Sequence, residues 1–269
     1  GRMKVLICGD VVGRSGREAL KVNIPTIRQK ENLDFVIVNG ENAASGFGIT
    51  KKICEEFYQI GVDVITTGNH VWDQREIIQH IETDSRLIRP CNFPENTPGK
   101  GFGIYQIKNG IRIIVINVMC TLFMESMDNP FASLEKILEK VGSLSGEYLI
   151  VVDVHGESTS EKMAIGHFLD GKVTSVTGTH THIPTSDLQI MSNGTFYQTD
   201  LGMCGDYDSV IGMNKENSLN RFLKENSTKH YPATGEATLS GVIVDCDIKT
   251  GLANHIESYI FGGKLKNTL

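Results

Sequence analysis

The sequence predicts an α/β protein in which two mixed β-sheets pack together and carry helices on their outer faces. Two observations predict this fold. Up to residue 82, short apolar runs alternate with amphipathic segments, the pattern of βαβ units around a parallel sheet. The pattern then changes, because two alternating runs meet at Asn109-Gly110, a dipeptide typical of β-hairpins. Further βα units and two more hairpins follow, so the chain has enough strands for two sheets.

The first part of the chain predicts a parallel, doubly wound core. Thr50 is a plausible helix N-cap and Gly61 a plausible helix end, whereas Pro25 predicts a kink. The strands are nearly continuous apolar runs, which predicts that both faces of the sheet are covered. The predicted strands are 4–9, 34–40 and 62–68, and the predicted helices are 17–30, 50–61 and 72–82.

The rest of the chain predicts hairpins and additional βα units. We find no repeat, low-complexity tract or linker, and therefore expect a single domain over residues 3–263. Gly1 and Arg2 precede the first Met and are interpreted as a cloning scar, and residues 264–269 are expected to fray. The predicted elements are a hairpin at 101–118, helices at 131–141 and 160–169, strands at 147–155 and 172–182, and hairpins at 188–199 and 239–261.

Composition restricts the classes of function. The net charge of −6 argues against a general electrostatic grip on nucleic acid or on an anionic membrane. The six cysteines form no C-x-x-C pair, which argues against a zinc knuckle and favours free thiols in a reducing compartment. No apolar run approaches the ~20 residues of a membrane span. We expect a cytoplasmic protein with no membrane partner and no extended nucleic-acid surface, and the sequence leaves a homo-oligomer open.

Polar side chains follow five of the predicted strands. In open α/β sheets the ligand crevice lies at the carboxyl ends of the strands, so these side chains are expected to surround one crevice. Carboxylate, amide and imidazole groups together suit a metal site with oxygen and nitrogen ligands. The residues are Asp10; Glu41 and Asn42; Asn69 and His70; Asp153, His155 and Glu157; and His180 and His182.

Each of these groups has another interpretation. A single histidine after a strand is often a hydrogen-bonded structural residue, and Gly-Asn-His can be a turn. The "HTH" histidines would project to one side of an extended segment, which favours shared ligation. A dinucleotide site at Gly9, Gly13 and Gly16 is the alternative, with Glu41 on a ribose, but the G-x-G-x-x-G spacing fails. The metal hypothesis also gives the strand-end histidines a role, and His80, His167, His230 and His255 are not expected to be ligands.

The combined motifs resemble a known family. "GNH", a later isolated His and "GTHTH" are similar to the calcineurin-like metallophosphoesterases. "GDVVG", "NGENAASGFGIT", "TTGNHVWDQ", "DVHGESTSEK" and "TDLGMCGDYDSVIGM" resemble the YmdB branch of that superfamily from Met3 to about Gly263. The resemblance implies a four-layer α/β/β/α sandwich, two divalent metal ions per chain, and phosphodiesterase activity, with 2′,3′-cyclic nucleotides as the associated substrates.

The resemblance also implies a role for each strand-end residue. Val12 stands where the superfamily has a histidine ligand, so one usual ligand is absent and Asn42 would replace it. Glu41 would bridge the two ions. Asp10, Asn42 and His182 would hold the first ion, and Asn69, His155 and His180 the second. His70 would face the substrate, and iron or manganese is favoured over zinc.

The implied mechanism is attack by a hydroxide that two metal ions activate. His70 is the predicted general acid for the leaving group, and Asp153 or Glu157 is predicted to orient a ligand histidine. Predicted substrate contacts are Ser45, Phe47, Trp72 and Tyr207, although Trp72 and Tyr207 can equally be structural. The rival hypotheses are a phosphomonoesterase or protein phosphatase on the same site, a regulatory ligand sensor with low turnover, and a nucleotide-cofactor oxidoreductase.

Overall fold

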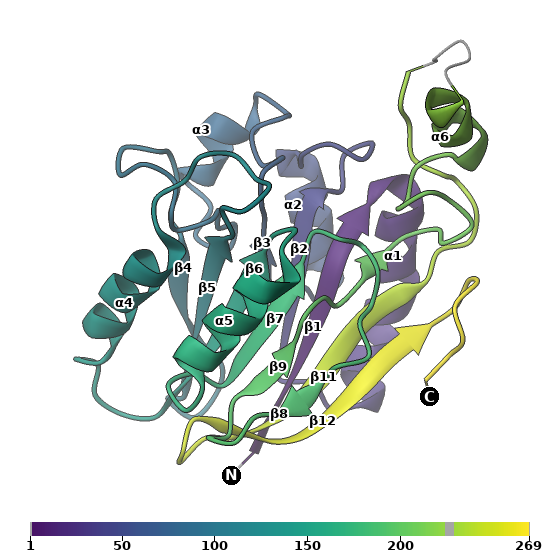
Figure 1. Cartoon of the computed structure of the whole chain (residues 1–269). Helices are drawn as coiled ribbons and strands as arrows, with labels where there is room; N and C mark the ends of the chain where they lie inside the picture. Colours follow the sequence, from purple (N-terminus) through teal and green to yellow (C-terminus); the bar gives the residue numbers. More distant parts are fainter. Residues whose placement is uncertain (1, 224–228, 269) are drawn as a thin grey trace.

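The structure consists of two six-stranded mixed sheets that pack face to face (Figure 1). It is a computed structural model, and it describes residues 2–223 and 229–268. The first sheet has the order β12-β11-β1-β2-β3, with β10 beside the end of β1: β1 (Arg2–Val12), β2 (Phe35–Asn42), β3 (Val64–Thr66), β10 (Met203–Cys204), β11 (Leu239–Asp247) and β12 (Leu252–Phe261). The second has the order β4-β5-β6-β7-β9-β8: β4 (Phe102–Gln106), β5 (Arg112–Met119), β6 (Tyr148–His155), β7 (Ser175–Thr179), β8 (Gln189–Ile190) and β9 (Phe196–Gln198).

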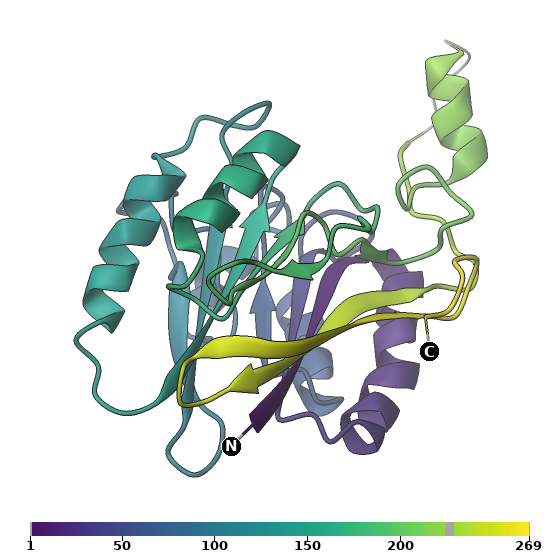
Figure 2. The same cartoon turned by 60° about the horizontal axis from the view of Figure 1, so that its bottom comes forward.

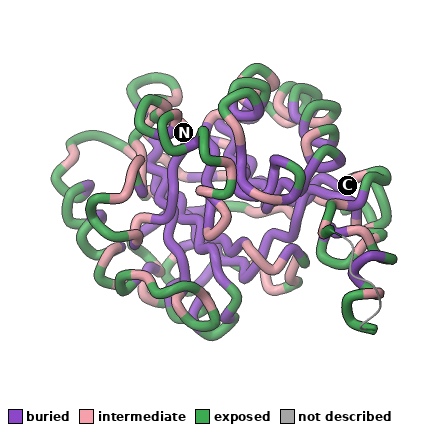
Figure 3. The backbone as a smooth tube through the Cα atoms, turned by 90° about the horizontal axis from the view of Figure 1, so that it is seen from above, coloured by how far each residue is buried: buried purple, intermediate pink, exposed green. Residues whose placement is uncertain are grey.

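Helices cover the outer face of each sheet, which confirms the four-layer α/β/β/α sandwich. The helices are α1 (Gly13–Lys30), α2 (Lys51–Gln59), α3 (Ile77–Ile81), α4 (Pro130–Val141), α5 (Thr159–Leu169) and α6 (Lys215–Phe222). The apolar core forms three clusters, one for each interface between layers. Val5, Ile37 and Val151 represent the cluster between the sheets, where alternate residues of both sheets interdigitate. The buried backbone accordingly follows the strands, and exposed residues gather in the loops and on the outer sides of helices (Figure 3).

The hairpin predictions are confirmed. Asn109 and Gly110 both have positive φ, 54° and 74°, as a two-residue hairpin turn between twisted strands requires. Strand β4 pairs with β5, β8 with β9, and β11 with β12, all antiparallel. Strands β1, β2 and β3 are parallel to one another, as are β5, β6 and β7. The carboxyl ends of the parallel strands are therefore available to build one site.

Three elements differ from the predictions. Helix α1 begins at Gly13 rather than residue 17, and α3 covers only Ile77–Ile81. The residues 72–76 before α3 form turns instead of helix, in which the N–H of Asp73 donates to the carbonyl of His70 and the N–H of Ile77 to the carbonyl of Gln74. Helix α6 is not among the predicted elements, and it stands apart from the sandwich in both views (Figures 1 and 2).

The ends of the chain are more regular than expected. Arg2, interpreted as part of a scar, belongs to β1 and pairs with Asp247, while Gly1 lies outside the described residues. In the tail for which fraying is expected, the backbone N–H of Thr268 donates to the carbonyl of Ile260 at 3.0 Å. Leu269 lies outside the described residues. None of the helices in the described part of the chain has the length and apolar character needed to cross a membrane, and all six cysteines are free thiols.

Candidate metal centre

The strand-end residues of both sheets meet at one edge of the sandwich. Asp10 lies in β1 between two register irregularities against β2, and such bulges re-aim a side chain. The backbone N–H of His180, just after β7, donates to Asp10 Oδ1 at 3.0 Å. Behind them, Asn39 Nδ2 donates to Asp153 Oδ2 at 3.0 Å and joins β2 to β6. Hydrogen bonds between buried polar groups thus hold the two sheets in register at the site.

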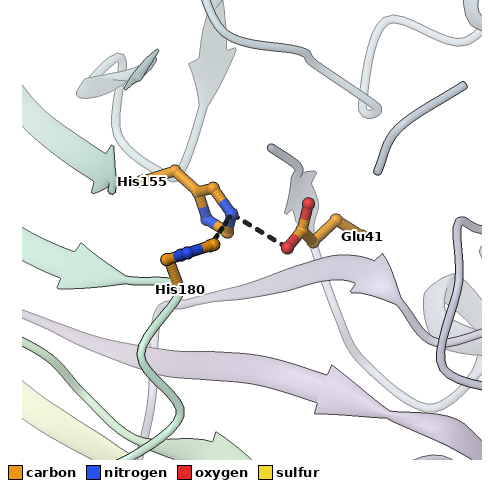
Figure 4. Close-up of side chains that lie close together, drawn as sticks. All are labelled: Glu41, His155 and His180. Carbon is orange, nitrogen blue, oxygen red and sulfur yellow. Dashed lines mark hydrogen bonds and ion pairs between the residues drawn. The ribbon is translucent and has the colours of Figure 1, made fainter. Parts of the chain in front are cut away.

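Glu41, His155 and His180 form the centre of the site (Figure 4). Glu41 Oε1 lies 2.8 Å from His155 Nε2, and His180 Nδ1 lies 3.3 Å from the same nitrogen. Asn69 Oδ1 is 2.9 Å from His155 Nε2. Four potential donor groups therefore converge on one point, and Glu41 and His155 are fully buried there.

Asp10, Asn42 and His182 form an adjoining group. Asp10 Oδ2 is 3.7 Å from His182 Nε2 and 3.9 Å from His155 Nδ1, and it has no hydrogen-bond partner although it is completely buried. Asn42 Nδ2 lies 3.2 Å from both His182 Nε2 and Glu41 Oε1. A buried carboxylate oxygen without a partner is costly, and a bound cation would satisfy it.

Outer hydrogen bonds fix the orientation of all three histidine rings. His155 Nδ1 lies 2.8 Å from Thr179 Oγ1, whose hydroxyl donates to Asp153 Oδ1. His182 Nδ1 donates to the carbonyl of Ile211 at 2.7 Å, and His180 Nε2 pairs with Glu157 Oε2 at 3.1 Å. In each ring the other nitrogen faces the cluster, which is the arrangement that orients metal-ligating histidines. Asp153 thus contacts the His155 ring through the Thr179 hydroxyl, whereas Glu157 contacts the His180 ring directly.

The electrostatics of the cluster also suit a cation. Burial raises the pKa of Asp10 to about 6. Burial alone would lower the pKa of His155, but the adjacent Glu41 carboxylate outweighs it and raises that pKa to about 9. Burial and the neighbouring His155 lower the pKa of His180 to about 3. In the absence of metal, protons on Asp10 and His155 therefore offset the negative charge of the buried carboxylates, which a bound divalent ion would offset instead. The oxygen and nitrogen donors of the cluster suit such an ion.

The stabilising effect of divalent metal is therefore expected to grow with pH. Without metal, the raised pKa of Asp10 gives stability that is full below pH 3.8 and is lost as pH rises through about 6. The raised pKa of His155 likewise gives stability that is full below pH 6.5 and is lost as pH rises through about 9. Metal ions compete with these protons, so the gap in Tm between Mn²⁺-loaded and chelator-treated protein should widen from about pH 5.5 to about pH 8.5.

Thermal unfolding at matched ionic strength measures this gap. The control is His80→Gln, whose ring pairs with Asp84 away from the strand ends and which should keep the same pH dependence. A gap that stays constant or shrinks with rising pH would contradict proton displacement from Asp10 and His155.

A cavity of about 360 Å³ opens over the cluster. His70 and Phe47 line it, with their rings 5.7 Å apart, and Asp73 Oδ2 holds His70 Nδ1 at 2.7 Å. The structure does not bring the other predicted substrate contacts into the lining. Ser45 is exposed, and Trp72 packs against Phe93 with ring centroids 5.8 Å apart. The Tyr207 hydroxyl bonds the backbone of Met203, so it supports its own loop.

Two features of the site escaped the sequence analysis. The "HTH" segment is not extended, because β7 ends at Thr179 and His180 and His182 have φ values of 103° and 73°. Both rings reach the site through this turn rather than through strand alternation. The cavity is also lined by His230 and Met213, which come from the region around α6. His230 lies outside every quoted motif, and Met213 ends the motif "TDLGMCGDYDSVIGM" but was not predicted to line the site. Both residues approach the strand ends only through the tertiary fold.

A second group of potential ligands lies between α2 and α3. It contains Cys54, His80 and Asp84. Asp84 Oδ2 already accepts from the Tyr58 hydroxyl at 2.7 Å and pairs with His80 Nε2 at 2.8 Å. Hydrogen bonds therefore satisfy this group, in contrast to the buried Asp10 oxygen without a partner.

Comparison with known proteins identifies the family. A family model described as YmdB-like protein matches residues 6–259. The chain belongs to the YmdB-like family. This confirms the resemblance seen in the sequence, and membership of the YmdB-like family implies divalent metal ions.

Individual relatives cover nearly the whole YmdB-like chain. A 2′,3′-cyclic-nucleotide 2′-phosphodiesterase of Bacillus subtilis (strain 168) is 43% identical over 255 residues, which are 95% of this chain and 96% of the relative. The crystal structure of a novel phosphatase from Mycoplasma pneumoniae has a TM-score of 0.90 at 34% identity and covers 97% of this chain and 94% of its own. A hypothetical protein from Thermus thermophilus has a TM-score of 0.89 at 38% identity, with 97% and 100% covered. These relatives confirm the predicted fold and the predicted enzyme class, a phosphoesterase.

Proposed function

We propose that the chain is a metal-dependent phosphodiesterase that hydrolyses small phosphodiesters, with 2′,3′-cyclic nucleotides as the preferred class. The observation that carries the proposal is the buried Asp10 oxygen without a partner, which faces His155 and His182 beside the Glu41 cluster. The named activity of the Bacillus subtilis relative supports the choice of substrate class.

The donor groups suit two divalent ions, iron or manganese being favoured. Asp10, Asn42 and His182 would hold one ion, Asn69, His155 and His180 the other, and Glu41 would contact both. When bound, the ions would supply positive charge for the phosphate oxygens and the acidity that makes water a nucleophile near neutral pH. The chain's own residues orient these donors through Thr179, Ile211 and Glu157.

The lining of the cavity favours a phosphodiester over a phosphomonoester. Among its described lining residues there is no Lys or Arg, so side chains offer little charge to balance a doubly charged monoester. A diester carries a single negative charge. Phe47 is the aromatic ring nearest to His70 in the lining and is proposed to contact the nucleoside base.

His70 is proposed to protonate the leaving oxygen. Its backbone N–H is anchored on Glu41 Oε2 at 2.8 Å, which fixes the residue beside the centre. Asp73 holds Nδ1, which leaves Nε2 as the ring nitrogen available to a substrate. The Asp73 carboxylate on Nδ1 also fixes the orientation of the ring, so that Nε2 can face the leaving oxygen.

A substrate panel tests the proposal. With Mn²⁺-loaded protein, kcat/KM for bis-p-nitrophenyl phosphate should exceed that for p-nitrophenyl phosphate by at least about tenfold, because one charge fewer must be balanced. Nucleoside 2′,3′-cyclic phosphates should be hydrolysed faster than 3′,5′-cyclic ones. A preference for the monoester would favour the phosphatase hypothesis. Binding without turnover of any ester in the panel would favour the regulatory sensor.

A further inference from the structure

A buried ion pair lies behind the two histidines that follow β7. Lys162 of α5 is 1% exposed and Asp200, after β9, is completely buried. Lys162 Nζ donates to Asp200 Oδ2 at 3.2 Å and to the carbonyl of Thr179 at 2.9 Å. Burying two charges costs more than burying apolar groups of similar size, so stability alone does not account for this pair.

Asp200 uses both of its oxygens to hold backbone near the site. Its Oδ2 accepts from the backbone N–H of Thr181 at 2.9 Å and from the Thr181 hydroxyl at 2.8 Å. Its Oδ1 accepts from the N–H of Gly202 at 2.8 Å. Together with Lys162 on the Thr179 carbonyl, these bonds fix the chain on both sides of His180. An apolar pair in the same space would leave the backbone N–H groups of Thr181 and Gly202 without these acceptors, and the carbonyl of Thr179 with only the N–H of Gly156.

The segment held in this way is strained. His180 and His182 both have positive φ, a region that residues with a Cβ rarely adopt and that persists only where the surroundings enforce it. The chain just before this segment packs closely against its neighbours. A Cβ added at Gly178 would lie 1.6 Å from the carbonyl oxygen of Thr199 and 3.2 Å from Lys162 Cδ.

We propose that Lys162 and Asp200 are positioning residues that hold the His180–His182 segment in the one conformation that directs both imidazoles at the metal centre. The inference rests on the proposed function of that centre. Neither residue is a proposed metal ligand. Lys162 holds the backbone carbonyl of Thr179, and Asp200 holds the backbone N–H of Thr181.

The test compares Lys162→Met with Glu161→Gln. Glu161 is the neighbouring residue on α5, and its buried carboxylate holds the backbone of Thr121 and Leu122, which carry no proposed ligand. Mn²⁺ affinity is measured by calorimetry, and the unfolding midpoint of the metal-free protein by urea titration. Lys162→Met should lower Mn²⁺ affinity about tenfold to a hundredfold, and Glu161→Gln should leave it unchanged while lowering stability.

The direction of the change in Mn²⁺ affinity separates a positioning role of Lys162 from an effect of its charge. Removing a cation beside a cation site would by itself raise Mn²⁺ affinity, so a loss of affinity reports a displaced ligand. Wild-type affinity in folded Lys162→Met, or an equal loss in Glu161→Gln at equal stability, would overturn the inference. If Lys162→Met does not fold, Thr181→Val decides: it removes one bond to Asp200, and unchanged affinity in that variant overturns the inference.

A crystal structure of metal-free Lys162→Met or Thr181→Val separates this inference from the proposed function. We expect His180 or His182 to leave its positive-φ conformation. If wild-type protein binds no Mn²⁺, the proposed function fails, and the conformation of the segment still decides the role of the ion pair. An unchanged segment in both variants means that Lys162 and Asp200 are not positioning residues.

Discussion

Replacing Glu41 with Gln is expected to lower kcat/KM for phosphodiesters by at least about a thousandfold and to remove most of the bound metal. Glu41 and Asp10 are the only carboxylates among the proposed ligands, so the substitution removes half of the negative charge that would hold the ions. Glu41 now uses one oxygen for His155 Nε2 at 2.8 Å and the other to accept from the N–H of His70 at 2.8 Å. The amide of Gln has only one oxygen, so it cannot replace both contacts. Metal analysis after dialysis and bis-p-nitrophenyl phosphate kinetics measure the two effects.

Glu157→Gln is the matched control for Glu41→Gln. It removes a carboxylate of the same cavity that contacts His180 Nε2 at 3.1 Å, but the side chain is 53% exposed. We expect a loss of less than about tenfold, because an exposed pair is screened by solvent. Equal losses of kcat/KM in both variants would mean that activity depends on the total negative charge of the cavity rather than on the buried position of Glu41. Full metal occupancy in Glu41→Gln would remove Glu41 from the ligand set.

The convergence of the strand-end residues was easier to predict from the sequence than the local backbone. Asp10, Glu41 and His155 could be found because parallel strands present their carboxyl ends at one edge, so residues distant in sequence converge by topology. The length of α3 could not be predicted, since residues 72–76 form turns in which the N–H of Asp73 donates to the carbonyl of His70 and the Gln74 side chain donates to the carbonyl of Phe47.

The residues that line the cavity were the least predictable part. Trp72 and Tyr207 have the chemistry to stack on a base, yet Trp72 packs against Phe93 and Tyr207 supports its own backbone. Conversely, His230 lines the cavity without belonging to any motif. Loop residues depend on how whole layers pack, which local composition does not encode. The ion pair between Lys162 and Asp200 could not be predicted for the same reason, because the two residues are neighbours only in the folded chain.

Replacing His70 with Gln is expected to separate substrates by their leaving groups. A general acid contributes about a hundredfold to ten-thousandfold when the leaving group is a poor one, such as the ribose oxygen of a 2′,3′-cyclic nucleotide. Nitrophenolate is stable without a proton, so turnover of bis-p-nitrophenyl phosphate should fall far less. The ratio of the two kcat values, measured for wild type and His70→Gln, reports the proton transfer independently of metal binding.

Asp73→Asn is the matched control for His70→Gln. Asp73 lies 2.7 Å from His70 Nδ1 but does not line the cavity, so its loss should loosen the orientation of the His70 ring without removing the ring. We expect a change in the same direction and of about threefold to tenfold, since this pair is more than a third exposed. Parallel losses for both substrates in His70→Gln would assign His70 to binding or to the support of Glu41. A loss of kcat confined to the nucleotide assigns it to protonation of the leaving oxygen, because nitrophenolate leaves without a proton whereas the ribose oxygen does not.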